Sequence, residues 1–276
     1  MTGLDLRPLS LAEILDRTFS LYRRNFLLFM GIAGIPALLQ LALGLGQIFY
    51  RNPLAPAAVL AMVVGIVVTA IVAFVAYLFS QGATILAVAD LYLGRETGIG
   101  QSLRRVWGNL LSLFGVLFLN GLLILLAAVA LIIPGIYMMC RLCVGVPAAL
   151  IEDRGPRESL SRSFELTRDF AGRAFVIYLL YFAVAFGITA LLTMPLSIVI
   201  VFTATQNPEM TRWLLALQQV VSTIGNVLVT PILLIATSVF YFDLRVRKEA
   251  FDLQFMLDPT SERTTRSQGE VPSILS

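Results

Sequence analysis

Apolar runs that approach or exceed the length of a membrane span alternate along this chain with short polar segments that carry most of its charge. A helix that crosses the hydrocarbon core of a bilayer needs about 20 apolar residues. Six runs fit this requirement, and they cover residues 26–50, 56–93, 110–133, 136–151, 174–203 and 213–243. The pattern predicts an all-α fold, a polytopic membrane bundle of six spanning helices.

The breaks between and within these runs predict how the helices connect. Only Pro134 and Gly135 separate the third run from the fourth, so these two spans should form an antiparallel hairpin with its turn at this dipeptide. Four further prolines lie within or near the runs, and each should kink its helix or leave a carbonyl group without a donor. These are Pro36, Pro147, Pro195 and Pro231.

A short pattern, (E/Q)-x-L-x-R-x-(F/W), occurs before the first, third and fifth runs, at residues 13–19, 101–107 and 158–164. Its leucine and aromatic residue lie four positions apart and share one helix face, as do its first residue and its arginine. Each segment should therefore be a short amphipathic helix on the membrane surface. The central arginines are Arg17, Arg105 and Arg162, and Ser10 with Glu13 predicts a capping box for the first helix.

A second pattern, D-L-x-(L/V)-x-(R/K)-E, closes the second and sixth runs at residues 90–96 and 243–249. Together the patterns predict three repeats, each a surface helix followed by two spans, at about 10–97, 98–155 and 156–250. Chance recurrence in arginine-rich amphipathic helices is the alternative. Asp90 and Asp243 begin the second pattern and should form ion pairs at the cytoplasmic interface, with proton coupling as the alternative role.

Charge divides the polar connections into two classes. Seventeen of the twenty basic residues, Arg245 among them, lie in the N-terminal segment, in residues 94–109 and 152–173, and after the last run. The alternate connections hold only Arg51 and Arg212. Because cytoplasmic loops carry an excess of Lys and Arg, this distribution places both termini in the cytoplasm. The basic face should also attract anionic lipids, at about 1 kcal/mol per well-placed residue.

Composition agrees with a membrane protein and excludes several enzyme classes. Of the 276 residues, 58% are hydrophobic and 13% are charged, whereas charged residues make up about a quarter of soluble domains. The chain contains no histidine, so histidine-based catalysis and the commonest zinc, haem and copper ligand sets are excluded. The first 25 residues do not resemble a cleaved signal peptide. We expect a protein that is not an enzyme, holds no cofactor or metal, and binds no nucleic acid.

The predicted domain organisation is a single membrane domain, residues 1–257, followed by a polar tail, residues 258–276, that should be disordered in the cytoplasm.

Residues 11–26, 159–168 and 241–249 carry a resemblance to a known family. They resemble the membrane domain of the bacterial glycerophosphoryl diester phosphodiesterase family, over about residues 7 to 255. The resemblance implies a protein of the bacterial inner membrane. It does not imply the activity, because the catalytic barrel depends on histidines and needs about 250 further residues.

Arg141 is the one basic residue inside an apolar run, where an arginine at the centre of a span costs about 2.5–3.5 kcal/mol. By depth, Gln40, Asn120 and Asn226 are better placed than Asp90 or Asp243 to satisfy it. Two interpretations remain open. Arg141 either joins helices by bonding carbonyl and amide groups, or it binds an anion or lipid phosphate in a polar cavity.

Cys140 and Cys143 have the C-x-x-C spacing of a redox pair, but two cysteines three positions apart also share a helix face as small apolar packing residues. We favour packing.

These features predict a membrane-organising or accessory protein that contacts anionic lipids and membrane protein partners. The alternative is a transporter or lipid-handling protein with a polar intramembrane cavity around Arg141.

Overall fold

The computed structural model describes residues 7–49, 56–95 and 97–249, and these ranges contain ten helices and no strand. The predicted tail at 258–276 lies outside them. The helices are α1 (Leu11–Arg24), α2 (Phe26–Phe49), α3 (Pro56–Tyr92), α4 (Ile99–Trp107), α5 (Leu110–Ala130), α6 (Ile132–Leu142), α7 (Gly145–Ile151), α8 (Pro156–Leu166), α9 (Ala171–Thr203) and α10 (Pro208–Glu249).

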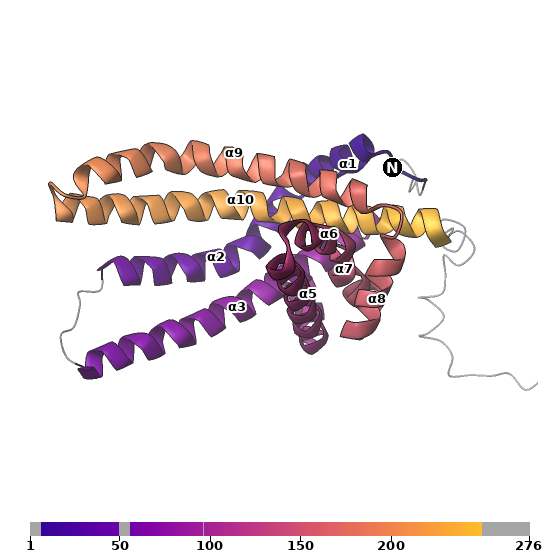
Figure 1. Cartoon of the computed structure of the whole chain (residues 1–276), viewed down its shortest axis with the longest axis horizontal. Coiled ribbons are helices and arrows are strands. Elements are labelled where there is room, and N and C mark those ends of the chain that lie inside the picture. Colours follow the sequence, from indigo (N-terminus) through magenta and orange to yellow (C-terminus); the bar gives the residue numbers. More distant parts are fainter. Residues whose placement is uncertain (1–6, 50–55, 96, 250–276) are drawn as a thin grey trace, which may run out of the picture.

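Six segments are long and apolar enough to cross a membrane, which confirms the all-α fold and the number of candidate spans. Four of them, α2, α3, α9 and α10, run side by side (Figure 1). α9 packs along α10, and α2 packs against both α3 and α10. Most predicted boundaries are close to the observed ones, but α10 begins before residue 213 and continues past 243.

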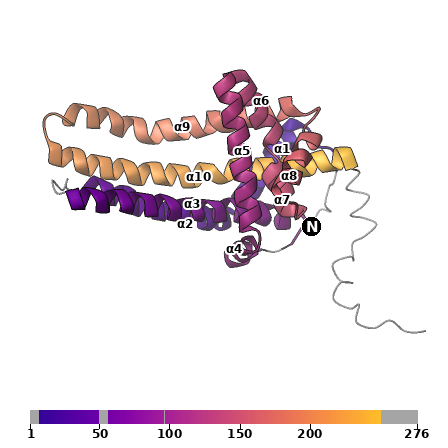
Figure 2. The same ribbon diagram turned by 60° about the horizontal axis from the view of Figure 1, so that its bottom comes forward.

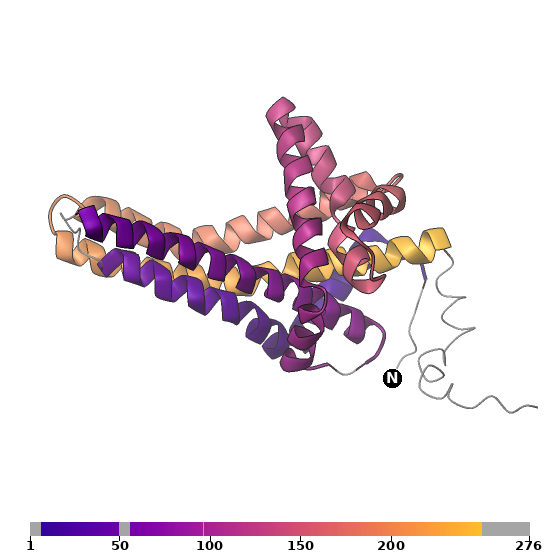
Figure 3. The ribbon, with the colours of Figure 1, turned by 90° about the horizontal axis from the view of Figure 1, so that it is seen from below.

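The α5–α6 hairpin does not follow the four long helices. It crosses them at a steep angle and projects away from them (Figures 2 and 3). The expected antiparallel pairing of the third and fourth segments is present, because α5 and α6 pack along each other. The six segments therefore do not form one parallel bundle.

The turn of this hairpin lies before the predicted dipeptide. Leu131 has an extended backbone, with φ −163° and ψ 148°, and separates the two helices. Pro134 falls in the first turn of α6, where its missing N–H has no intrahelical acceptor to lose, so it does not break the helix. Gly135 allows the close approach of the hairpin, since a Cβ atom there would lie 2.8 Å from Cα of Ala128.

Two of the four prolines have visible consequences. Pro36 lies inside α2, where it removes the usual donor for the carbonyl of Ile32, and the hydroxyl of Ser80 on α3 donates to that carbonyl at 3.2 Å. Pro147 lies in the first turn of α7, and the chain leaves helical geometry between α6 and α7. Pro195 and Pro231 stand inside α9 and α10, which continue through them.

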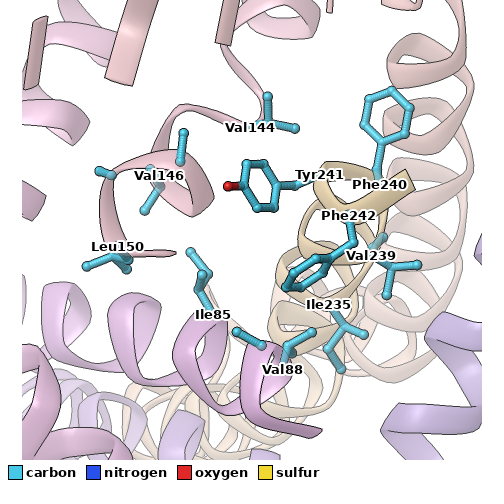
Figure 4. Close-up of a cluster of buried hydrophobic side chains, with 14 of the residues drawn as sticks. Ile85, Val88, Val144, Val146, Leu150, Ile235, Val239, Phe240, Tyr241 and Phe242 are labelled. Carbon is cyan, nitrogen blue, oxygen red and sulfur yellow. The ribbon is translucent and has the colours of Figure 1, made fainter. Parts of the chain in front are cut away.

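Many of the buried side chains lie where α1, α4, α7 and α8 gather around one end of the four long helices, which we call the charged end. Here Ile85 and Val88 of α3, Leu150 of α7 and Val239 and Phe242 of α10 form one apolar core (Figure 4). α1 packs along the same half of α10, and its predicted capping box is present, with the N–H of Ser10 donating to Glu13 at 2.7 Å. The packing of these buried helix faces holds in position the polar side chains that are described below.

Candidate functional site

Asp243 is the centre of a buried ion-pair cluster at the charged end. Its side chain is fully buried and accepts hydrogen bonds from Arg247 at 2.9 Å, from Arg173 at 3.2 Å and from the backbone N–H of Leu9 at 2.7 Å. Both arginines also donate to the carbonyl of Leu9. The cluster therefore joins α10 to the start of α9 and to the segment before α1.

Glu152 is the centre of a second cluster, at the end of α7. Its carboxylate accepts from the hydroxyl of Tyr241 at 2.7 Å and from Arg162 at 3.2 Å, and Arg154 lies 2.6 Å away. Burial alone would raise the pKa of Glu152, but the hydrogen bond from Tyr241 and the charge of Arg162 outweigh it and lower that pKa. Glu152 is therefore a carboxylate in the folded protein at neutral pH.

The third buried carboxylate, Asp90 at the end of α3, pairs with Arg105 of α4 at 2.7 Å. Beside it, Arg17 of α1 donates to the hydroxyl of Tyr92 at 3.1 Å, and the ring of Tyr92 stacks on Phe242 with centroids 4.5 Å apart. Both partner residues, Asp90 and Tyr92, lie in the last turn of α3.

Each arginine of the (E/Q)-x-L-x-R-x-(F/W) pattern contacts the C-terminal end of a longer helix. Arg17 and Arg105 reach the end of α3, and Arg162 reaches Glu152 after α7 and Glu249 at the end of α10. A cation at a helix C-terminus is favourable because of the helix dipole. The spacing also allows Arg162 to pair with Glu158, but Arg162 turns inward to the buried carboxylate instead.

A second class of arginine at the charged end is exposed and has no ion-pair partner among the described residues. Its members are Arg23, Arg24, Arg104, Arg157 and Arg168. They lie at the end of α1, on α4, and on and just after α8. The buried carboxylates are thus neutralised by one set of arginines, while another set leaves its positive charge open to anions.

Arg141, at the end of α6, contacts α8 and the residues after it. Its guanidinium donates to the carbonyl of Phe164 at 2.7 Å and to that of Arg168 at 3.2 Å, and it lies 5.3 Å from the centre of the Phe164 ring. In return, the Arg141 carbonyl accepts from the hydroxyls of Ser163 and Thr167. These contacts favour the interpretation in which Arg141 joins two helices, rather than the one in which it binds an anion.

Gln40 and Asn226 line a cavity of about 260 Å³ between α2, α3 and α10. Tyr77, Ser80, Gln81 and Thr230 add further polar groups, and none of the described residues that line the cavity is charged. Gln81 is buried, with 7% of its surface exposed. Gln40 and Asn226 are both exposed, so the cavity opens at the surface of the helices, and their amides have no hydrogen-bond partner within the part of the chain that is described. Pro36 lines the same space.

The structure separates Arg141 from the three residues that we expected around it, and it does not keep those three together. Gln40 and Asn226 share the cavity, Asn120 of α5 lies beside Gly145 of α7, and Arg141 faces α8. The expected grouping fails because counting depth along each helix treats the six segments as parallel, whereas the α5–α6 hairpin crosses the others. Asn120 is buried, and its side-chain oxygen has no partner among the described residues.

Sequence reasoning missed Tyr77, Gln81 and Thr230 as neighbours of Gln40 and Asn226. A usable signal is present on α10, where Gln219, Thr223, Asn226 and Thr230 follow helical spacing and mark one polar face. On α3, a single glutamine in a long apolar helix has no such periodic pattern.

Cys140 is buried, Cys143 is half-buried, and both are free thiols. Among the described residues, no group of three or more His, Cys, Asp or Glu side chains could hold a metal ion.

Comparison with known proteins yields no relative. No family model matches the chain, and no curated protein and no solved structure matches it either. The family resemblance drawn from the sequence patterns therefore stays a prediction.

Proposed function

We propose that this chain is a multi-pass protein of the bacterial inner membrane with its charged end in the cytoplasm, and that it has a membrane-organising or accessory role rather than an enzymatic one. It acts by binding anionic lipids at that end and offers the same surface to membrane protein partners. One observation carries the proposal: five exposed arginines there lack an ion-pair partner among the described residues. Arginine suits lipid phosphate because its planar donors bind phosphate oxygens in pairs.

The proposed architecture is three repeats of an amphipathic helix and two spans. Each of α1, α4 and α8 precedes a pair of longer segments, and the patterned arginine of each contacts a helix C-terminus. Membership of the glycerophosphoryl diester phosphodiesterase membrane domain family belongs to the same proposal.

Replacing the five unpaired arginines with glutamine tests the lipid role. In nanodiscs with equal amounts of phosphatidylglycerol and phosphatidylcholine, the wild-type protein should retain more phosphatidylglycerol on extraction, and the preference should weaken in high salt. The variant should lose the preference. Arg212→Gln, at the opposite end of α10, is the control that should keep it. An unchanged preference in the five-residue variant refutes the proposal.

The proposed orientation has its own test. Ser161 is exposed on α8, so a single cysteine there in a variant with Cys140 and Cys143 replaced by serine should react with a membrane-impermeant maleimide only from the cytoplasmic side. Reaction from the other side alone contradicts the orientation.

The second candidate function, a transporter or lipid-handling protein, is carried by the cavity between α2, α3 and α10. Polar groups without partners are costly in hydrocarbon, so two unpartnered amides at one cavity call for water or a polar ligand. The absence of charged lining residues points to a neutral ligand with hydrogen-bond donors and acceptors.

Thiol labelling can test whether water enters this cavity. A maleimide reacts with the thiolate, which forms only where water reaches the sulfur. In the cysteine-free background, a cysteine at Asn226 should react faster than one at Ile224, which is exposed on α10 outside the cavity lining. Equal or slower labelling at residue 226 argues for a dry cavity and removes this candidate.

A further inference from the structure

An apolar groove of about 650 Å³ lies between α3, α4 and α2. Ile71, Val72, Val75, Ala76 and Phe79 of α3 line its length, Ile35 of α2 lines one side, and α4 supplies Leu103, Arg104 and Trp107. The α3 residues repeat at intervals of three and four positions, so they form a continuous apolar stripe along one helix face.

Arg104 of α4 is the one charged residue among the described residues that line the groove. Phe79, the α3 lining residue nearest the charged end, packs against Trp107 with ring centroids 5.5 Å apart. Arg104 precedes Trp107 by one helical turn, is exposed and has no ion-pair partner among the described residues. Its neighbour in sequence, Arg105, is already engaged by Asp90. The free positive charge therefore lies where the groove meets the charged end.

The direction of the groove matches the direction of a lipid. From Phe79 to Ile71 the stripe extends eight residues along α3, or about 12 Å, away from the charged end and toward the middle of the helix. A phospholipid of the adjacent leaflet runs the same way, with its phosphate at the interface and its acyl chains toward the bilayer centre. Trp107 is 71% exposed beside Arg104, and tryptophan favours the headgroup level of a membrane.

We infer that this groove binds one anionic phospholipid, with the phosphate at Arg104, the glycerol region against Trp107 and one acyl chain along the α3 stripe. The inference rests on the proposed lipid role and adds a defined site to it. The groove supplies shape and apolar contact, and Arg104 supplies the preference for a negative headgroup.

Native mass spectrometry of delipidated protein titrated with phosphatidylglycerol tests the site. Arg104→Gln should weaken the tightest phosphatidylglycerol binding about fivefold, which corresponds to about 1 kcal/mol. Arg104→Lys should restore most of it. Ala76→Phe, which fills the groove, should displace phosphatidylglycerol and phosphatidylcholine alike. Inorganic phosphate should not compete, because it lacks the acyl chain.

The matched control is Arg157→Gln, which removes another exposed arginine without an ion-pair partner among the described residues, from α8 and outside the groove lining. Equal weakening by the Arg104 and Arg157 variants overturns the defined site but leaves the general attraction of the charged end intact. If the Arg104 variant, the Arg157 variant and the five-arginine variant all keep the lipid preference, the proposed function itself is refuted. Arg104 is on the surface, so its replacement should leave the fold unchanged, and circular dichroism checks this.

Discussion

Helix α10 carries polar side chains in two contrasting environments. Asp243, at the charged end, is fully buried and bonded to two arginines and a backbone N–H. Asn226 lies 17 residues earlier, about 25 Å along the helix, where it is exposed at the open cavity and its amide has no partner among the described residues. One polar group is completely satisfied within the protein, and the other is not.

The difference separates groups that hold the fold together from groups that are open to something else. The Asp243 cluster joins α9, α10 and the segment before α1, so disrupting it should lower the free energy of unfolding. The cavity residues Gln40 and Asn226 contribute no hydrogen bond to the described part of the fold. Substituting them should therefore change the access of water or ligand to the cavity rather than the stability of the protein. The predictions below run from the strongest expected effect to the weakest.

Asp243→Asn should give the largest loss of stability. The substitution removes the counter-charge of Arg173 and Arg247, and breaking a buried ion pair by removing one partner typically costs about 3–5 kcal/mol. Denaturant unfolding in detergent, followed by circular dichroism, measures the change. Asp153→Asn is the control, because Asp153 is exposed with φ 51°, a conformation that asparagine also adopts. A change below about 1 kcal/mol for Asp243→Asn would show that the cluster does not hold the helices.

Glu152 should make stability depend on pH. Its pKa is lowered in the folded protein, so the unfolded state binds a proton more readily than the folded state as the pH falls. Its contribution is therefore complete above the unfolded pKa of about 4.3 and is lost as the pH falls through the lower folded value. Glu152→Gln should lower the unfolding free energy at pH 7 and flatten its dependence on pH below about pH 5. Parallel pH profiles for the two proteins would contradict this role.

Ser10→Ala should cost about 1 kcal/mol through loss of the α1 capping box. Ser10 follows Leu9, whose backbone bonds the Asp243 cluster, so the cap also positions that segment. The matched control is Ser161→Ala in the interior of α8, where the serine is exposed. Thermal unfolding of both variants in the same detergent measures the difference. Equal unfolding midpoints would show that the capping box does not stabilise the protein.

Features with a local physical cause could be predicted from the sequence. The starts of α2, α3 and α5 follow from apolar run length, and the capping box follows from two residues three positions apart. The charges at the ends of α3 and α10 were also recognisable as ion-pair partners by type, although the choice of partner was not. Arg162 bonds Glu152 rather than Glu158 because burial of α8 turns that face inward.

Features that depend on how whole helices cross could not be predicted in the same way. Nothing in residues 110–142 indicates that α5 and α6 project at a steep angle, since both are apolar and of spanning length. Arg141 illustrates the consequence: its carbonyl partners belong to Phe164 and Arg168, in a segment that depth counting placed outside the membrane. Two of the cavity's amides, Gln40 and Asn226, were selected from the sequence as polar residues at mid-depth, but they were expected around Arg141 rather than around this cavity.

Asn226→Leu should have the smallest effect on stability, within about 0.5 kcal/mol of wild type, because the amide has no partner among the described residues to lose. The matched control lies two turns earlier on α10, where Gln218 donates to the hydroxyl of Ser197 at 2.8 Å. Gln218→Leu should cost about 0.6 kcal/mol, the average for an interhelical hydrogen bond in a membrane. Unfolding free energies in the same detergent compare the two variants. A larger loss at Asn226 than at Gln218 would mean that ordered water or a bound ligand already hydrogen-bonds this amide in the folded protein. Asp243 and Asn226 would then both be hydrogen-bonded, and they would differ only in the partner, which is the protein itself for Asp243 and water or a ligand for Asn226.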